Sequence, residues 1–87
     1  MFRIWGKIWK DNHMIRDTVV SDDSYDNRTK KVLRCLESIC YAFDLENPIW
    51  LDANISQFQR SARTRFTQDS FVEQISFDNL EIQVIEE

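Results

Sequence analysis

The sequence predicts a small α+β domain in which a mostly antiparallel sheet carries one long amphipathic helix on one face. Three observations predict it. Two runs of alternating apolar residues, joined by a short polar turn, open the chain, and another such run closes it. Between them, one segment repeats its apolar residues with a helical period. Strands grouped around a single helix are typical of α+β folds and not of alternating α/β folds.

The helix is predicted over Tyr25–Phe43. At about 100° per residue its apolar positions fall within an arc of roughly 120°, the width of a helix face that packs on a core. We expect Ser24 or Asp26 to accept the free N–H groups of the first turn. This cap explains the acidic residues before the helix, so we favour it over a metal site. The helix should end near 44–46, because Asn47 precedes a proline.

Alternation predicts strands at both ends of the chain. Phe2–Trp9 and Met14–Val20 form the two arms of a hairpin, and Leu80–Ile85 forms the final strand. Asp11 and Asn12 lie between the arms, and both residue types tolerate the positive φ of a two-residue hairpin loop. The sequence therefore predicts an N-terminal hairpin plus a C-terminal strand.

A two-residue loop also predicts the hairpin register. It places Ile8 opposite Ile15 and Gly6 opposite Asp17, with Arg16 on the face away from the helix. Asp17 would then point toward the helix, where a carboxylate needs a hydrogen-bond partner or a place at the sheet margin. A slip of one residue would reverse both faces of the second strand.

The segment between the helix and the last strand is the least regular. Ile49–Leu51 predicts one short strand after the proline. Asp52–Asn79 holds four phenylalanines, and Thr67 or Asp69 could cap one or two helical turns within it. We expect this partly helical aromatic segment to close the core. Because one helix already covers the first face of the sheet, the economical place for the segment is across the second.

Length and composition predict one domain, residues 1–87, and restrict its function. A net charge of −4 gives no general attraction to nucleic-acid backbones. Arg3 and Lys7 interrupt the apolar residues at the N-terminus, so we expect no signal peptide. Cys35 and Cys40 would lie about 8–9 Å apart on the helix, whereas a disulfide needs Cα atoms within about 7 Å. Two reduced thiols favour a cytoplasmic location.

Trp5 and Trp9, interleaved with Lys7 and Arg16, form the first candidate binding surface. Aromatic rings among cations are typical of surfaces that stack bases and contact phosphates. Three interpretations compete. We favour burial of both rings beneath the phenylalanine-bearing segment, then a surface for a protein partner, and last a single-stranded nucleic-acid platform.

Arg60, Arg63 and Arg65 form a second candidate, because three guanidinium groups in one loop could meet a phosphate or an acidic partner. We favour the simpler interpretation that these arginines balance the Asp and Glu residues of an acidic chain.

No pair of residues predicts catalysis, and we expect neither a cofactor nor a metal ion. The single glycine excludes glycine-rich nucleotide loops, and no CxxC or HExxH spacing is present. His13 is the only histidine and lies in the predicted hairpin turn. An enzyme would depend on Asp17, His13 and Asp52, and these residue types fit solvated or capping positions as well.

Four stretches resemble a group of short, uncharacterised bacterial proteins. They are Trp5–Ile8, Pro48–Leu51, Arg65–Thr67 and Leu80–Glu87. The resemblance covers most of the chain and implies no activity, cofactor or partner.

We therefore predict a protein–protein interaction or regulatory module without catalysis. Its partner would be another protein or a second copy of the chain, and no membrane is involved. The alternative is single-stranded nucleic-acid binding through Trp5, Trp9, Lys7 and Arg16.

Overall fold

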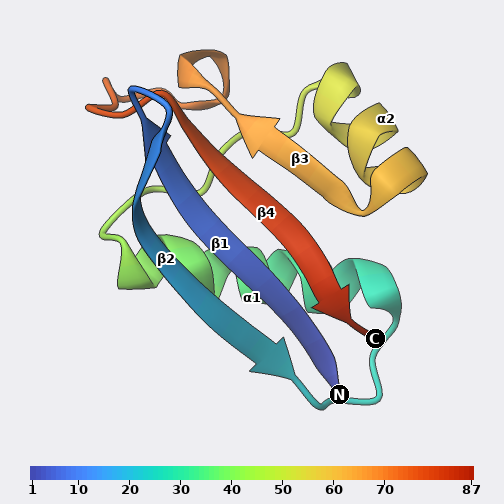
Figure 1. Cartoon of the computed structure of the whole chain (residues 1–87). Coiled ribbons are helices and arrows are strands. Elements are labelled where there is room, and N and C mark those ends of the chain that lie inside the picture. The colour runs from blue at the N-terminus through green and yellow to red at the C-terminus, as the bar shows by residue number, and fades with distance from the viewer.

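A computed structural model, which describes all of residues 1–87, contains a four-stranded antiparallel sheet in the order β2–β1–β4–β3 (Figure 1). The strands are β1 (Phe2–Lys10), β2 (His13–Asp22), β3 (Arg63–Phe66) and β4 (Asn79–Glu86). The helices are α1 (Arg28–Ala42), α2 (Asp52–Ser61) and a short 3₁₀ helix, η1 (Gln68–Ser70). The predicted α+β architecture is confirmed. Neither α-helix has the length and apolar character that a bilayer-crossing helix needs.

The hairpin has the predicted loop but not the predicted register. Asp11 and Asn12 have φ angles of 52° and 65°, as the two-residue loop requires. Beyond it the register shifts by one residue, so that Ile8 pairs with Arg16 and not with Ile15. Ile15 is the additional residue of a β-bulge, which the apolar pattern did not indicate.

The bulge reverses the predicted faces of β2. Arg16 lies on the helix side, where its guanidinium stands 4.9 Å from the ring centre of Phe43 and donates to the Ala42 carbonyl at 3.4 Å. Asp17 lies on the opposite side, where it accepts a hydrogen bond from Nε1 of Trp5 at 2.9 Å. Both placements correct the expectations drawn from the unbulged register.

Helix α1 begins three residues later than predicted. Asn27, and not Ser24 or Asp26, caps it, because the Asn27 side chain accepts the backbone N–H of Lys30 at 2.9 Å. Tyr25, which the helical wheel placed on the buried arc, therefore precedes the helix and is fully exposed.

Helix α1 ends at Ala42, two residues before the predicted end near 44–46. Asp44 takes a left-handed conformation, with φ of 57°, and donates to the Tyr41 carbonyl. Leu45 donates to the Cys40 carbonyl at 2.8 Å, which completes a Schellman motif. These two bonds satisfy carbonyl groups that the last turn would otherwise leave free.

One apolar core lies between the sheet and the helices. It contains Phe2, Ile4, Ile8, Val32, Cys35, Leu36, Ile39, Cys40, Phe43, Phe58, Phe66, Phe71, Leu80 and Ile82. At Gly6 the sheet and α1 approach so closely that a Cβ atom would lie 2.6 Å from Cγ2 of Ile39. Glycine is therefore required at this position by packing, since Ile39 is fully buried and cannot withdraw.

The third strand was predicted in the wrong place. Ile49–Leu51 is not a strand, and β3 instead occupies Arg63–Phe66. Its alternation is short: Thr64 and Phe66 are buried while the two arginines are exposed. The segment predicted to be irregular also contains the ten-residue helix α2. After Thr67, where one or two helical turns were predicted, only the three residues of η1 are helical.

The phenylalanine-bearing segment closes the core on the same side as α1, which corrects the prediction that it covers the second face. Trp50 packs edge-to-face against Phe58 of α2 and Phe66 of β3, with ring centres 5.5 Å and 5.0 Å apart. Figure 1 shows α1 behind the strands and no helix in front of them. The opposite face of the sheet is left uncovered.

Gly6→Ala should lower the free energy of unfolding by about 1–3 kcal/mol, because the new methyl group would overlap Ile39. Urea unfolding measures this loss. In an Ile39→Ala background the same methyl group would partly fill the cavity, so its cost should fall toward zero. Additive effects of the two substitutions would contradict this packing argument.

Candidate interaction surface

The sheet face away from the helices is the candidate site, and we call it the outer face. Cross-strand pairing places on it Arg3, Trp5, Lys7 and Trp9 of β1, Asp17 and Val19 of β2, Arg63 and Arg65 of β3, and Asn79, Glu81 and Gln83 of β4. Directly paired residues of antiparallel strands point to the same side, so these side chains form one continuous surface.

Glu81 is the centre of the outer face. Its side chain is only 3% exposed, and it accepts a hydrogen bond from Nε1 of Trp9 at 2.8 Å. Three cations surround this one carboxylate: Lys7 at 3.8 Å, Arg63 at 3.6 Å and Arg65 at 3.8 Å. All three distances exceed the 2.7–2.9 Å of direct charge-assisted hydrogen bonds. The Glu81 carboxylate therefore makes only long ion pairs with Lys7, Arg63 and Arg65. Because one negative charge faces three positive charges, the cluster keeps a local excess of positive charge.

The two guanidinium groups of this cluster are available to a ligand. The side chains of Arg63 and Arg65 are 54% and 58% exposed. They line a polar hollow beside β3 together with Gln57, Ser61, Thr64, Thr67 and Glu81. Each guanidinium carries five N–H donors, of which the long contacts with a single carboxylate use few.

The other tryptophan is held in a similar way. The Trp5 indole donates to Asp17 at 2.9 Å, and the ammonium of Lys7 lies 4.0 Å from the Trp5 ring centre. Lys7 also donates to Gln83 at 3.0 Å, which helps to satisfy an ammonium group that is largely removed from water. Each indole N–H is thus fixed by a carboxylate, so both rings are held in place before any partner arrives.

The structure brings together five of the seven predicted site residues: Trp5, Lys7, Trp9, Arg63 and Arg65. It separates the other two. Arg16 points to the helix side, and Arg60 lies in the last turn of α2.

Sequence reasoning missed Glu81 and Asp17 as members of the site. The alternation of the last strand did place Glu81 opposite the apolar positions, but a single exposed-looking glutamate carried no sign that three cations would converge on it. Of the residues on which an enzyme would depend, Asp17 bonds Trp5, His13 pairs with Lys10 beside the hairpin loop, and Asp52 opens α2.

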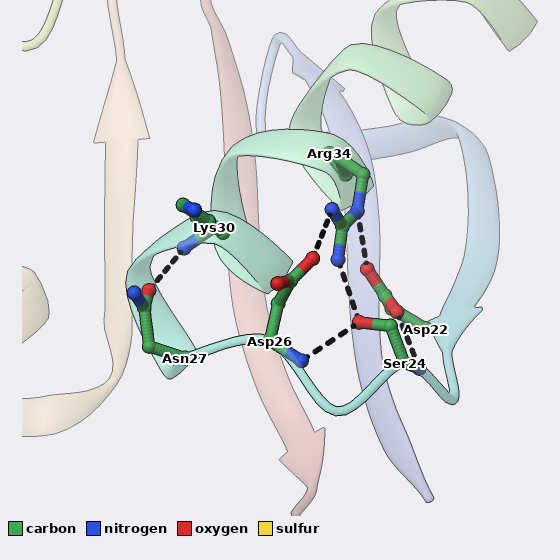
Figure 2. Close-up of polar contacts among 6 residues, drawn as sticks. All are labelled: Asp22, Ser24, Asp26, Asn27, Lys30 and Arg34. Atoms are coloured by element: carbon green, nitrogen blue, oxygen red, sulfur yellow. Dashed lines mark hydrogen bonds and ion pairs between the residues drawn. The ribbon is translucent and has the colours of Figure 1, made fainter.

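Asp22 and Asp26, two of the acidic residues before α1, form a network around Arg34 (Figure 2). The guanidinium donates to Asp22 at 2.8 Å, to Asp26 at 2.7 Å and to the Ser24 hydroxyl at 2.6 Å. The hydrogen bond from Arg34, followed by one from the Ser24 backbone N–H, lowers the pKa of Asp22 from 3.8 to about 2. The same acidic partners raise the pKa of Arg34. This network ties the end of β2 to the first half of α1.

Both cysteines are buried and unpaired. Burial raises the pKa of Cys40 to about 12. It also raises the pKa of Cys35, with a smaller contribution from the negative charge of Asp22. Thiols with raised pKa values are poor nucleophiles, so the two side chains act as core residues.

Comparison with protein families, with curated proteins and with solved structures finds no match for this chain. The geometry of the outer face is therefore what supports a function.

Trp9→Phe should lower the free energy of unfolding by about 1–3 kcal/mol, because it leaves the buried Glu81 carboxylate without its one short hydrogen bond. Trp5→Phe is the matched control. It removes the same indole donor from an exposed carboxylate, Asp17, which water can solvate. Equal losses for the two variants in urea unfolding would contradict the central role of Glu81.

Acid unfolding should report the Asp22–Arg34 contact. The folded-state pKa of Asp22 lies below its unfolded value, so its contribution to stability is fully present above pH 3.8 and is lost as the pH falls toward about 2. Asp22→Asn should therefore lose less stability than the wild type across this window. Asp23→Asn is the control, and a wild-type slope in Asp22→Asn would refute the assignment.

Proposed function

We propose that this protein is an interaction module without catalysis, which binds a partner protein through its outer face. The single observation that carries the proposal is that no helix covers a sheet face on which Trp9 and three cations are arranged around Glu81 and Trp5 is held by Asp17. Tryptophan and arginine are enriched among the residues that dominate binding energy at protein interfaces.

The hydrogen bonds of the outer face favour binding to a protein. A side chain that is already held in one rotamer loses little entropy on association, and Trp5, Lys7 and Trp9 are held in this way. The exposed guanidinium groups of Arg63 and Arg65 then favour a partner that presents carboxylates to them.

Single-stranded nucleic acid is the second candidate. Its support is the position of Arg65, whose guanidinium carbon lies 5.8 Å from the ring centre of Trp9, so that a cation and an aromatic ring are adjacent. Against it stands Asp17, which places an exposed carboxylate at the Trp5 indole and would repel a phosphate backbone. The net charge of −4 acts in the same direction.

The free, buried thiols of Cys35 and Cys40 support the cytoplasmic location that we include in the proposal. Bacterial origin is supported by the resemblance of the sequence alone.

A photo-crosslinking amino acid at Thr67, which lines the polar hollow beside Arg65, should capture a protein in the cell that makes this chain. The same group at Glu37, on the exposed side of α1, is the matched control and should not capture that protein. Arg63→Gln combined with Arg65→Gln keeps amide donors near the buried Glu81 and should strongly reduce the adduct at Thr67, with circular dichroism as the check that the variant is folded. Adducts that are equal at both positions, or unaffected by the loss of the two positive charges in a folded variant, would contradict the proposal.

Titration with a single-stranded oligonucleotide separates the two candidates. We expect no quenching of tryptophan fluorescence at low salt. Quenching that weakens as salt is added would instead favour nucleic-acid binding.

A further inference from the structure

The two edges of the sheet differ in how they are closed. On the β3 edge, the Asn54 side chain of α2 donates a hydrogen bond to the Arg65 carbonyl at 2.9 Å. The helix therefore satisfies a backbone acceptor that a further strand would need. β2 is the opposite edge and pairs only with β1. It is ten residues long, and Val19, at the middle of the stretch Arg16–Asp22 that follows the bulge, is 49% exposed. An open strand of this length is a template for pairing with another strand.

We propose that two copies of this protein pair along β2, antiparallel and centred on Val19, to form one continuous eight-stranded sheet. This edge borders the outer face used in the proposed function, since Asp17 and Val19 belong to both, but neither proposal requires the other.

The length of the regular part of β2 selects this centre. Beyond the bulge at Ile15, the strand runs from Arg16 to Asp22 in unbroken register with β1. A bulge bends a strand and ends regular pairing, so these seven residues are the ones available to a second strand. In a two-fold symmetric pair each residue faces its mirror position, and only the central residue faces itself. Full use of Arg16–Asp22 therefore places Val19 on the axis.

The charges of β2 agree with the same centre. With Val19 on the axis, Arg16 of each copy lies opposite Asp22 of the other, and Asp17 lies opposite Ser21. Both copies of the arginine thus meet an opposite charge across the strands, which is stabilising.

A centre at Thr18 would pair only Arg16–Val20 of the regular part, and three other registers bring like charges together. A centre at Asp17 places two aspartates opposite each other, and a centre at Arg16 places two arginines opposite each other. A centre at Val20 brings Asp17 against Asp23 of the second copy. Like charges in direct opposition destabilise a strand pair, so these registers are disfavoured.

Arg16 and Asp22 keep free hydrogen-bond donors and acceptors for a contact between the two copies. Arg16 makes one long hydrogen bond, to the Ala42 carbonyl, and keeps its other donors. Asp22 accepts one bond on each carboxylate oxygen, from Ser24 and from Arg34, and each oxygen can accept another. Val19 pairs with Trp5 on the outer face, so the contact between two Val19 side chains would join the outer faces of both copies.

Sedimentation of the full chain over a range of concentrations should show a monomer–dimer equilibrium. Val19→Lys places two like charges on the axis and should raise the dimer dissociation constant roughly tenfold or more. Val72→Lys is the matched control, because Val72 is 83% exposed and outside the sheet, and its dissociation constant should equal the wild-type value. A wild-type chain that is monomeric throughout, or a Val19→Lys dimer as strong as the control, would overturn the proposal.

Cysteine pairing tests the register. Opposed residues of antiparallel strands have Cα atoms about 4.5–5.5 Å apart, within the range of a disulfide. Oxidised Val19→Cys should form a covalent dimer, and so should a mixture of Asp17→Cys with Ser21→Cys. Ser21→Cys alone should not, because its two copies would be four residues, about 13 Å, out of alignment. The native cysteines are buried and do not compete. Absence of the Val19→Cys product, or efficient crosslinking of Ser21→Cys alone, would overturn this register.

Discussion

The close approach of α1 to β1 at Gly6 is the constraint on which the rest of the structure depends. Because no Cβ stands between them, Ile39 fills the space above the sheet and the helix lies directly on the backbone of β1. The helix then covers the apolar side of β1, and α2 extends the same layer beside it. The buried apolar side chains of the second half of the chain, Phe58, Phe66, Phe71, Leu80 and Ile82, lie in this one interior, and the outer face is left mainly to polar and aromatic residues.

An uncovered sheet face must satisfy its polar groups without help from another layer. Here Glu81 does so for three strands at once, because it accepts from the Trp9 indole of β1 and faces the cations of β1 and β3. The carboxylate is removed from water by its own neighbours and not by a covering element. Such a network is stabilising only while its members remain satisfied. It also fixes the aromatic rings, and this connects the stability of the sheet to its ability to bind.

The N-terminal end of α1 is held by a second polar network, on the other side of the sheet. Arg34 joins the end of β2 to the loop that leads into the helix, so Asp22 and Asp26 of the acidic stretch are satisfied within the chain (Figure 2). No group of three or more potential metal ligands gathers in the structure. The same aspartate, Asp22, ends the regular part of β2, where its carboxylate retains acceptor capacity toward a neighbouring strand.

The sequence by itself determined the elements that have a strong local period: the hairpin with its loop at Asp11 and Asn12, the long helix and the last strand. It also placed Trp5, Lys7 and Trp9 on one face, because alternation in a single strand requires nothing else. The tertiary structure alone decided the bulge at Ile15, since a one-residue insertion leaves the apolar pattern almost unchanged while reversing every side chain beyond it. It also decided that four residues of a basic stretch form β3, because pairing with β4, and not local propensity, makes so short a strand. The cluster around Glu81 depends on that pairing, so no local signal could have predicted it.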